Sequence, residues 1–232
     1  MKVKLLRVTE DGVNLVAETA KVSGSLSEQS AEEILGLITE NDYSSVLEHI
    51  SFTFDISEIS VALSRELLEH RVGVSHTARS TRYNEEEGFG YFVPDELSKK
   101  QNFNANLAFT AAMRNAKESY KKLRRLGVAR EQARYVLPLA LHTHYVVTMN
   151  ARSLINFFML RLCVRAAPEM QALAKRLHEI CVAEYPDIFS RVGCRGVTWG
   201  VCPENEVRPA GCPFKECVPT KSEVKAKMKN QK

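Results

Sequence analysis

Cationic and amide side chains lie inside an otherwise apolar segment, residues 133–161, and this segment is where the chain is best equipped for chemistry. It contains Arg134, Arg152 and Arg161 together with Asn150 and Asn156. Burying a guanidinium group without a partner costs several kcal/mol, so such groups persist in a core only where something neutralises them. A bound anion is one candidate partner, and carboxylates elsewhere in the chain are the other. We therefore expect a binding site for an anionic ligand here.

The spacing of these residues predicts a helix that begins after residue 150. Asn150 is a favourable N-cap residue, and the sequence Ala-Arg-Ser-Leu that follows it starts a helix well. On this helix Arg152 and Asn156 share a face because they are four residues apart. Arg161 lies about half a turn away from Arg152, since each residue advances the helix by about 100°. Either two pockets share the helix, as at a subunit interface, or one of the two sets is structural.

Cysteines form a second group of residues that could bind a metal or form covalent bonds. Four of the six lie in a Gly- and Pro-rich C-terminal segment, and these are Cys194, Cys202, Cys212 and Cys217. Four thiolates can hold zinc tetrahedrally. The spacings lack the Cys-x-x-Cys pair of a zinc knuckle, so disulfides and free thiols stay open as alternatives. We predict no catalytic metal, and these four residues are the candidate ligands of a structural one.

Strand-like and helix-like segments alternate along the chain, which predicts an α+β fold. We expect an antiparallel or mixed central sheet with flanking helices, in a single compact domain that assembles as an oligomer. Alternating or β-branched runs predict strands at residues 2–8, 50–56, 89–93 and 143–148. Helical periodicity and cap signals predict helices at residues 30–40, 59–71, 104–126 and 168–185. A capping box of Ser30 and Glu33 opens the first of these.

Composition is typical of a soluble globular protein. The 232 residues carry a net charge of +4, with 26% charged and 44% hydrophobic residues. No apolar run approaches the ~20 residues of a membrane span, and the N-terminus lacks a signal peptide, so we expect a cytoplasmic protein without a membrane partner. We expect a main domain over residues 1–190, a cysteine-rich segment over 191–218 and a disordered tail over 219–232.

Several motifs in a fixed order resemble those of the flavin-dependent thymidylate synthases, over roughly residues 1 to 185. The first is Ala133-Arg134-Tyr135-Val136-Leu137-Pro138, followed by Thr148-x-Asn150-x-Arg152-Ser153-Leu154-x-Asn156-Phe157 and then Leu160-Arg161. Upstream, residues 45–54 resemble the strand that follows a Glu-His pair, and residues 64–71, Ser75 and residues 80–83 resemble the family's signature segment. Several weak motifs in the right order are far more specific than any one alone.

The resemblance implies a reaction and a set of ligands. Such enzymes methylate deoxyuridine monophosphate (dUMP) to dTMP with methylenetetrahydrofolate, through a flavin adenine dinucleotide (FAD) that NADPH reduces. It implies a homotetramer with sites between subunits. Residues that match flavin contacts are Ser51, His70, Arg71, Asn150, Ala151, Arg152 and Asn156. Residues that match substrate contacts are Ser80, Arg82, Arg134 and Arg161, and Arg161 also matches the arginine that polarises the pyrimidine.

The signature segment departs from the family pattern at three points. Glu69 stands where the family has an arginine, and a carboxylate beside phosphate-bearing ligands would repel them. Eight residues separate Arg71 from Ser80, where the family has seven. Ala78 replaces a glutamine or glutamate. Either Arg71 or Arg79 could supply the missing charge.

Two other functions are compatible with the sequence. Glu69 and Ala78 would fit a flavoenzyme of the same fold that acts on another pyrimidine nucleotide. The net positive charge and the cysteines would fit a zinc-containing nucleic-acid-binding protein. The 28 acidic residues and the lack of a concentrated basic face argue against nucleic acid as a partner.

Overall fold

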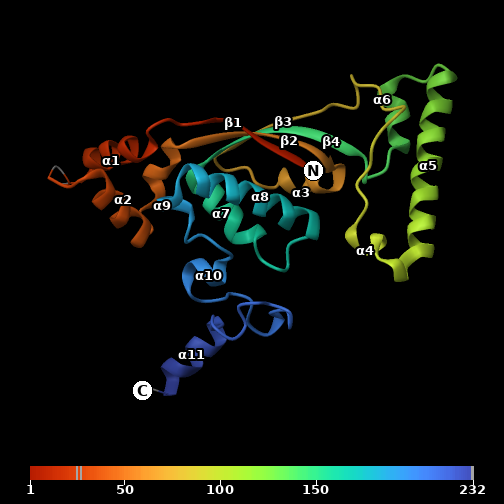
Figure 1. Ribbon diagram of the computed structural model, residues 1–232. Helices are drawn as coiled ribbons and strands as arrows, with labels where there is room; N and C mark the ends of the chain where they lie inside the picture. Colours follow the sequence, from red (N-terminus) through yellow and green to blue (C-terminus); the bar gives the residue numbers. More distant parts are fainter. Residues whose placement is uncertain (25, 27, 231–232) are drawn as a thin grey trace. The chain divides into compact units, whose positions relative to one another are not determined.

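Four strands form one sheet in a computed structural model of the protein, which describes residues 1–24, 26 and 28–230 (Figure 1). The spatial order is β1 (Lys2–Val8), β2 (Ser51–Ser60), β4 (His142–Asn150) and β3 (Val74–Ala78). The pairs run antiparallel: Thr9 pairs with Ser51 at one end of β1, and Lys2 meets Glu58 at the other. The predicted α+β class with an antiparallel central sheet is confirmed.

The alternating pattern of β2 divides its side chains between two faces. Phe52 and Phe54 are fully buried, whereas Thr53 and Asp55 between them are only partly covered. Phe52 packs edge-on against Tyr185 and Phe189 at ring-centroid distances of 5.9 and 5.7 Å. Hydrophobic burial of this face therefore fixes the register of the strand, because a slip by one residue would expose every phenyl ring.

The chain divides into two compact units. Unit 1 comprises Met1–Lys4, Phe54–Arg71 and Ser75–Val147, and unit 2 comprises Leu5–Thr53, Val72–Val74 and Thr148–Lys232. Unit 1 contains helices α3 (Val61–Leu67), α4 (Asp95–Ser98), α5 (Phe103–Arg125) and α6 (Arg130–Ala133), with the short 3₁₀ segments η2 (Lys100–Asn102) and η3 (Arg134–Val136). In this unit α4 and α6 lie beside the long helix α5 (Figure 1).

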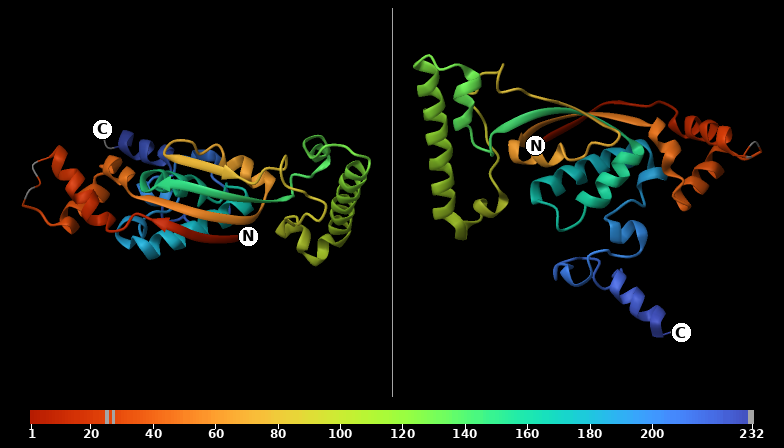
Figure 2. Two further views of the ribbon diagram at one scale, coloured as in Figure 1. Left: turned by 90° about the horizontal axis from the view of Figure 1, so that it is seen from above. Right: turned by 180° about the vertical axis from the view of Figure 1, so that it is seen from behind.

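Unit 2 contains the remaining helices of the described chain. They are α1 (Gly12–Ser23), α2 (Ala31–Glu40), η1 (Ser44–His49), α7 (Ala151–Arg161), α8 (Pro168–Glu184), α9 (Pro186–Phe189), α10 (Arg195–Trp199), η4 (Asn205–Val207) and α11 (Lys221–Asn230). Helices α1 and α2 lie side by side, as both views of Figure 2 show. The boundaries suggested by the sequence, after residues 190 and 218, stay a prediction.

Local chemical signals place several helices correctly. The Ser30 hydroxyl accepts from the Glu33 N–H at 3.2 Å, while the Glu33 carboxylate accepts from the Ser30 N–H at 2.9 Å, so the capping box is confirmed. Helix α5 ends before Gly127, which adopts φ +82°, a conformation that favours glycine. The apolar stripe of α8 is buried along its whole length.

Other elements differ from the expectation. The helix expected over residues 59–71 begins only at Val61, because Ile59 and Ser60 still belong to β2. The strand expected over residues 89–93 is reduced to one bridge between Tyr91 and Leu141. Residues 221–230, where the sequence suggests disorder, are helical in α11. None of the helices in the described chain is long and apolar enough to cross a membrane.

Candidate functional site

The start of α7 carries the largest group of expected site residues, all in unit 2. Asn150 is the N-cap, and its side-chain oxygen accepts from the Ser153 N–H at 2.8 Å, as the sequence predicts. The Ala151 N–H donates to the Ile50 carbonyl at 2.8 Å, which joins the start of the helix to the start of β2. The positive end of the helix dipole and the exposed Arg152 side chain make this position favourable for an anion.

Arg152 and Asn156 point outward from this helix. Both side chains are exposed, whereas Leu154, Phe157 and Phe158 face the core. The Arg152 guanidinium donates to the Glu48 carboxylate at 2.5 Å. The expectation that these polar groups lie in the core is therefore wrong, because the apolar residues and the polar residues occupy different faces of one helix.

Ser51 is the next residue after Ile50, and Ile50 contacts the start of α7. Ile50, which precedes it, accepts the hydrogen bond from Ala151. Ser51 itself pairs with Thr9 and lines a hollow with residues 7–10. His49, which precedes Ile50, is exposed and does not belong to the core.

Arg161 lies at the opposite end of α7. It is nine positions beyond Arg152 in the same helix, which is about 13.5 Å along the axis. Arg161 is partly buried and lines a cavity of about 280 Å³, together with Met159 and residues of the cysteine-rich segment. Unit 2 therefore brings Asn150, Ala151 and Arg152 together and keeps Arg161 apart from them.

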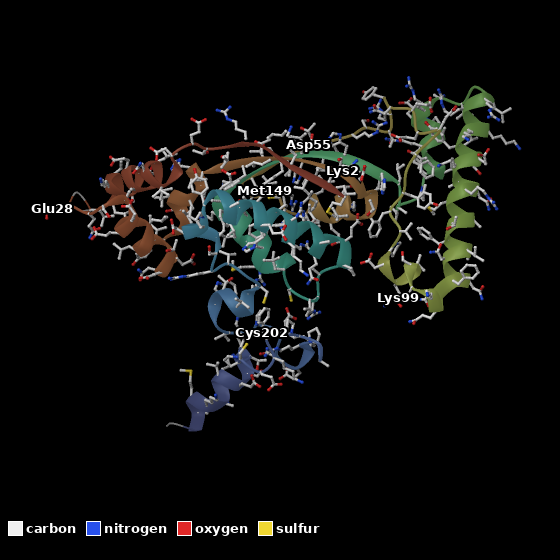
Figure 3. All side chains as sticks on the ribbon, viewed as in Figure 1. Lys2, Glu28, Asp55, Lys99, Met149 and Cys202 are labelled. Carbon is white, nitrogen blue, oxygen red and sulfur yellow. The ribbon has the colours of Figure 1, made fainter. Side chains whose placement is uncertain are left out.

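The cysteines of the C-terminal segment do not form the expected group of four. Cys194, Cys202 and Cys212 line the cavity beside Arg161, and the fourth thiol there is Cys163 rather than the exposed Cys217. Figure 3 shows Cys202 in the loop between α10 and α11. All six cysteines are free thiols. In the described part of the chain, no group of three or more His, Cys, Asp or Glu residues is arranged to hold a metal ion.

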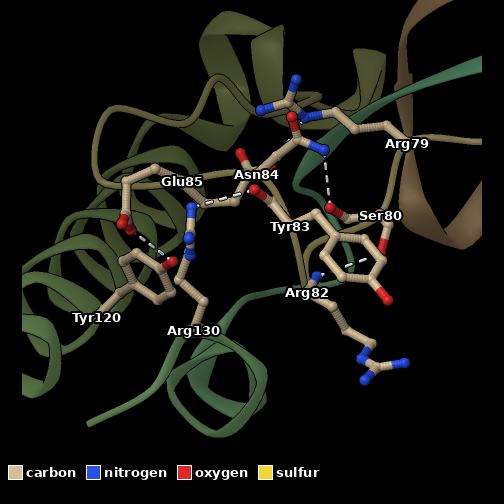
Figure 4. Close-up of polar contacts among 9 residues, drawn as sticks. Arg79, Ser80, Arg82, Tyr83, Asn84, Glu85, Tyr120 and Arg130 are labelled. Atoms are coloured by element: carbon tan, nitrogen blue, oxygen red, sulfur yellow. Dashed lines mark hydrogen bonds and ion pairs between the residues drawn. The ribbon is translucent and has the colours of Figure 1, made fainter.

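Residues 80–84 form a tight turn in unit 1. The Ser80 carbonyl accepts from the Asn84 backbone N–H at 3.1 Å and from the Asn84 side-chain amide at 2.9 Å. The Ser80 hydroxyl accepts from the Arg82 N–H at 3.3 Å, and the Arg130 guanidinium donates to the Tyr83 carbonyl at 3.1 Å (Figure 4). The turn thus fixes a hydroxyl and the backbone of a cationic residue next to each other.

Two of the expected substrate cations stay accessible in this unit. The Arg82 side chain is 50% exposed, donates to Glu131 at 3.2 Å and lies 5.3 Å from the centre of the Tyr83 ring. Arg134 is partly buried and lies over the Tyr135 ring at 5.7 Å. An aromatic face does not neutralise a guanidinium group, and the pair of Arg82 with Glu131 is exposed, so an anionic ligand can replace Glu131 at little cost.

Arg79 serves a different purpose. Its Nε donates to the carboxylate of Glu86 at 2.9 Å, and Glu86 is only 6% exposed. Figure 4 shows the Arg79 and Arg82 side chains pointing away from each other. Arg79 therefore neutralises a buried carboxylate and is poorly suited to replace the arginine that Glu69 displaces. Arg71, which is exposed, is the better suited of the two.

His70 is buried, and its carbonyl is hydrogen-bonded to the His76 ring at 2.8 Å. Its neighbours Glu69 and Arg71 are exposed. The expected substrate residues Ser80, Arg82 and Arg134 thus belong to unit 1 with His70 and Arg71, and the other expected flavin residues belong to unit 2 with Arg161.

The sequence did not reveal which carboxylates pair with the arginines of the site. The run Glu85-Glu86-Glu87 supplies the buried partner of Arg79, which is Glu86. It also supplies Glu85, whose carboxylate accepts from the Tyr120 hydroxyl at 2.7 Å. The hydrogen bond from Tyr120 lowers the pKa of Glu85. The sequence feature that could have indicated these contacts is the presence of three adjacent carboxylates in an arginine-rich stretch.

Comparison with known proteins identifies the family. Residues 4–187 match the family described as "Thymidylate synthase complementing protein" (Thy1). The chain is 38% identical over 216 residues to the flavin-dependent thymidylate synthase of Geobacter sulfurreducens, covering 88% of this chain and 91% of that protein. It is 38% identical over 205 residues to that of Sulfurisphaera tokodaii, covering 83% and 78%. It is 33% identical over 207 residues to that of Nitratidesulfovibrio vulgaris, covering 85% and 83%. These matches extend over the motifs of α7 and of the signature segment, and the chain therefore belongs to the Thy1 family.

Proposed function

We propose that this protein is a flavin-dependent thymidylate synthase that methylates dUMP to dTMP. The match of residues 4–187 to the Thy1 family carries this proposal. Methylenetetrahydrofolate is the proposed one-carbon donor and NADPH the proposed reductant of FAD. The relatives named for this activity support the flavin, and the family motifs support the other two ligands.

The first turn of α7 suits the phosphate end of a flavin nucleotide. The helix dipole, the Asn150 side-chain amide and the exposed Arg152 guanidinium place positive charge and hydrogen-bond donors at one helix start. Ser51, His70, Arg71, Ala151 and Asn156 complete the proposed flavin contacts. The flavin, when bound and reduced, supplies the hydride that the methyl group requires.

The remaining proposed residues act on the nucleotide substrate. Ser80 and Arg82 would hold the phosphate of dUMP, since a hydroxyl beside a planar guanidinium group matches phosphate geometry. Arg134 would bind the same nucleotide. Arg161 would lie beside a uracil oxygen, where a fixed cation stabilises the charge that develops as C5 becomes nucleophilic. No protein nucleophile is required in this scheme.

We also propose that the enzyme is a cytoplasmic homotetramer with sites shared between subunits. The two ends of α7 support the sharing, because Arg152 and Arg161 are half a turn and about 13.5 Å apart. One pocket in one chain cannot readily use both residues.

A second candidate is a flavoenzyme of this family that acts on a different pyrimidine nucleotide. Glu69 favours it, because this exposed carboxylate replaces a cation expected beside two phosphate-bearing ligands. Replacing Glu69 by arginine separates the candidates: a variant that gains activity on dUMP over the wild type supports the altered specificity. Unchanged activity removes Glu69 as an explanation.

Tritium release from dUMP labelled at C5 tests the proposed function. We expect release that requires the protein, methylenetetrahydrofolate and NADPH together, with dTMP as product. Purified protein that stays colourless after addition of FAD, and that releases no tritium, would contradict the proposal.

A further inference from the structure

The turn formed by Val72 and Gly73 lies directly against the start of α7, within unit 2. The Asn150 N–H donates to the Gly73 carbonyl at 3.2 Å, and the Ser153 hydroxyl donates to the Val72 carbonyl at 2.7 Å. Both contacts use main-chain oxygens of the turn, while the Val72 side chain is 89% exposed. The turn is therefore held to the helix by its backbone and contributes little to the core.

Gly73 leaves no room for a side chain. It adopts φ +65°, which favours glycine, and a Cβ atom there would lie 2.3 Å from Ser153 Oγ and 2.4 Å from Asn150 Nδ2. Neither neighbour is free to move: Ser153 is bonded to the turn, and the Asn150 side chain caps the helix. Any larger residue must displace one of these two groups.

The strand that follows the turn pairs regularly with β4. Gly73 pairs with Asn150, and Arg79 pairs with His144. The two contacts are therefore the same number of residues apart on each strand, six. The pairing of β3 with β4 thus contains no bulge between these points. A one-residue bulge in this part of β3 therefore does not account for the added length between Arg71 and Ser80.

We propose that the Val72–Gly73 turn is a positioning element for the flavin-binding start of α7, with Gly73 as its essential residue. The turn holds the Asn150 backbone N–H and the Ser153 hydroxyl, and thereby orients the first helical residues, Ala151 and Arg152, toward the proposed cofactor site. Gly73 and Ser153 act through these neighbours and touch no reacting atom. This inference rests on the proposed function, because the flavin contacts themselves are proposed.

Titration of FAD into the purified full-length protein, followed by flavin fluorescence, tests the positioning role. We expect Gly73→Ala to weaken FAD binding at least about tenfold. Gly127→Ala is the matched control: Gly127 also has a positive φ, +82°, but a Cβ there meets nothing within 4 Å. Both variants carry backbone strain and should lose thermal stability, whereas only Gly73→Ala should lose affinity for FAD.

A second variant covers the case in which Gly73→Ala does not fold. Ser153→Ala removes only the hydroxyl bonded to the Val72 carbonyl, and we expect a weakening of FAD binding by about threefold or more. Wild-type affinity in a folded Gly73→Ala variant, or in Ser153→Ala if the former does not fold, would overturn this inference alone. A wild-type protein that binds no FAD would overturn the proposed function and this inference with it.

Discussion

The Arg152 guanidinium donates to the Glu48 carboxylate at 2.5 Å, although 104 positions separate the two residues in the chain. Both side chains are about half exposed, at 51% and 48%. An exposed ion pair of this kind stabilises a protein by only about 0–1 kcal/mol. A phosphate-bearing ligand can therefore replace Glu48 as the partner of Arg152 at little cost.

Glu48→Gln is expected to strengthen FAD binding severalfold. The substitution keeps the size of the side chain and removes the charge that competes with the cofactor phosphates. The gain should shrink as salt concentration rises, because salt screens exposed charges. FAD titrations at low and high salt measure this, and weaker FAD binding by the variant would show that Glu48 orients Arg152 instead of competing for it.

Arg152→Ala is expected to weaken FAD binding by about 10- to 100-fold, since a charge-assisted hydrogen bond is worth about 1.5–3 kcal/mol. Arg176→Ala is the control, because Arg176 is likewise exposed and paired with a glutamate, at 2.8 Å, on another helix of the same unit. Equal FAD affinities in the two variants would remove Arg152 from the flavin site.

Arg82→Ala is expected to raise the KM for dUMP at least about tenfold, through loss of a charged hydrogen bond to phosphate. FAD content should stay unchanged. Arg125→Ala, a change of an exposed arginine at the end of α5, should leave both quantities unchanged. Steady-state kinetics with dUMP as the varied substrate checks this, and a normal KM in Arg82→Ala would exclude the phosphate role.

Arg161→Ala is expected to lower kcat by about 10²–10³-fold, the usual effect of removing a group that stabilises developing charge. Arg161→Lys keeps the charge and should lose less. Arg165→Ala is the control, because Arg165 lines the same cavity and is paired with Glu204. Comparable losses in the Ala variants at 161 and 165 would point to damage to the cavity rather than to lost electrostatic stabilisation.

Glu85, which follows the turn at residues 80–84, makes the stability of unit 1 depend on pH. The Tyr120 hydroxyl, and after it Arg124, lower the pKa of this carboxyl below its ordinary value in the folded state. A lowered folded-state pKa stabilises the protein above the unfolded pKa, and this stability is lost as pH falls through the folded-state pKa. Glu85→Gln should therefore lose less stability than the wild type on acidification below about pH 4.5. Because Glu85 is 40% exposed, screening limits the difference to ~1 kcal/mol or less. Unfolding in denaturant at pH 7 and pH 4 measures it, and parallel losses in both proteins would contradict this role.

Features set by neighbouring residues were predictable from the sequence. The capping box of Ser30, the N-cap of Asn150 and the buried stripe of α8 depend on residues a few positions apart. Helix α1 was missed because Asp11-Gly12 indicates a turn, and Asp11 does adopt a positive φ of 51°, but the helix starts immediately after it.

Contacts between distant residues were not predictable from one sequence. The expected strand over residues 89–93 has the right local pattern, yet it makes only one bridge, because strand formation depends on a partner elsewhere. In the candidate site, the motifs gave the cations but not the carboxylates that pair with them. Glu48 and Glu131 come from other segments, and nothing in their local sequence marks them as partners of arginines.

The absorbance spectrum of the purified protein, recorded with FAD before and after addition of dUMP, tests most directly whether these arginines bind phosphorylated ligands. We expect a bound-flavin spectrum that shifts when dUMP is added, because the proposed transfer requires the flavin and dUMP to lie next to each other. A protein that retains no flavin after reconstitution, or whose flavin spectrum does not respond to dUMP, would contradict the account.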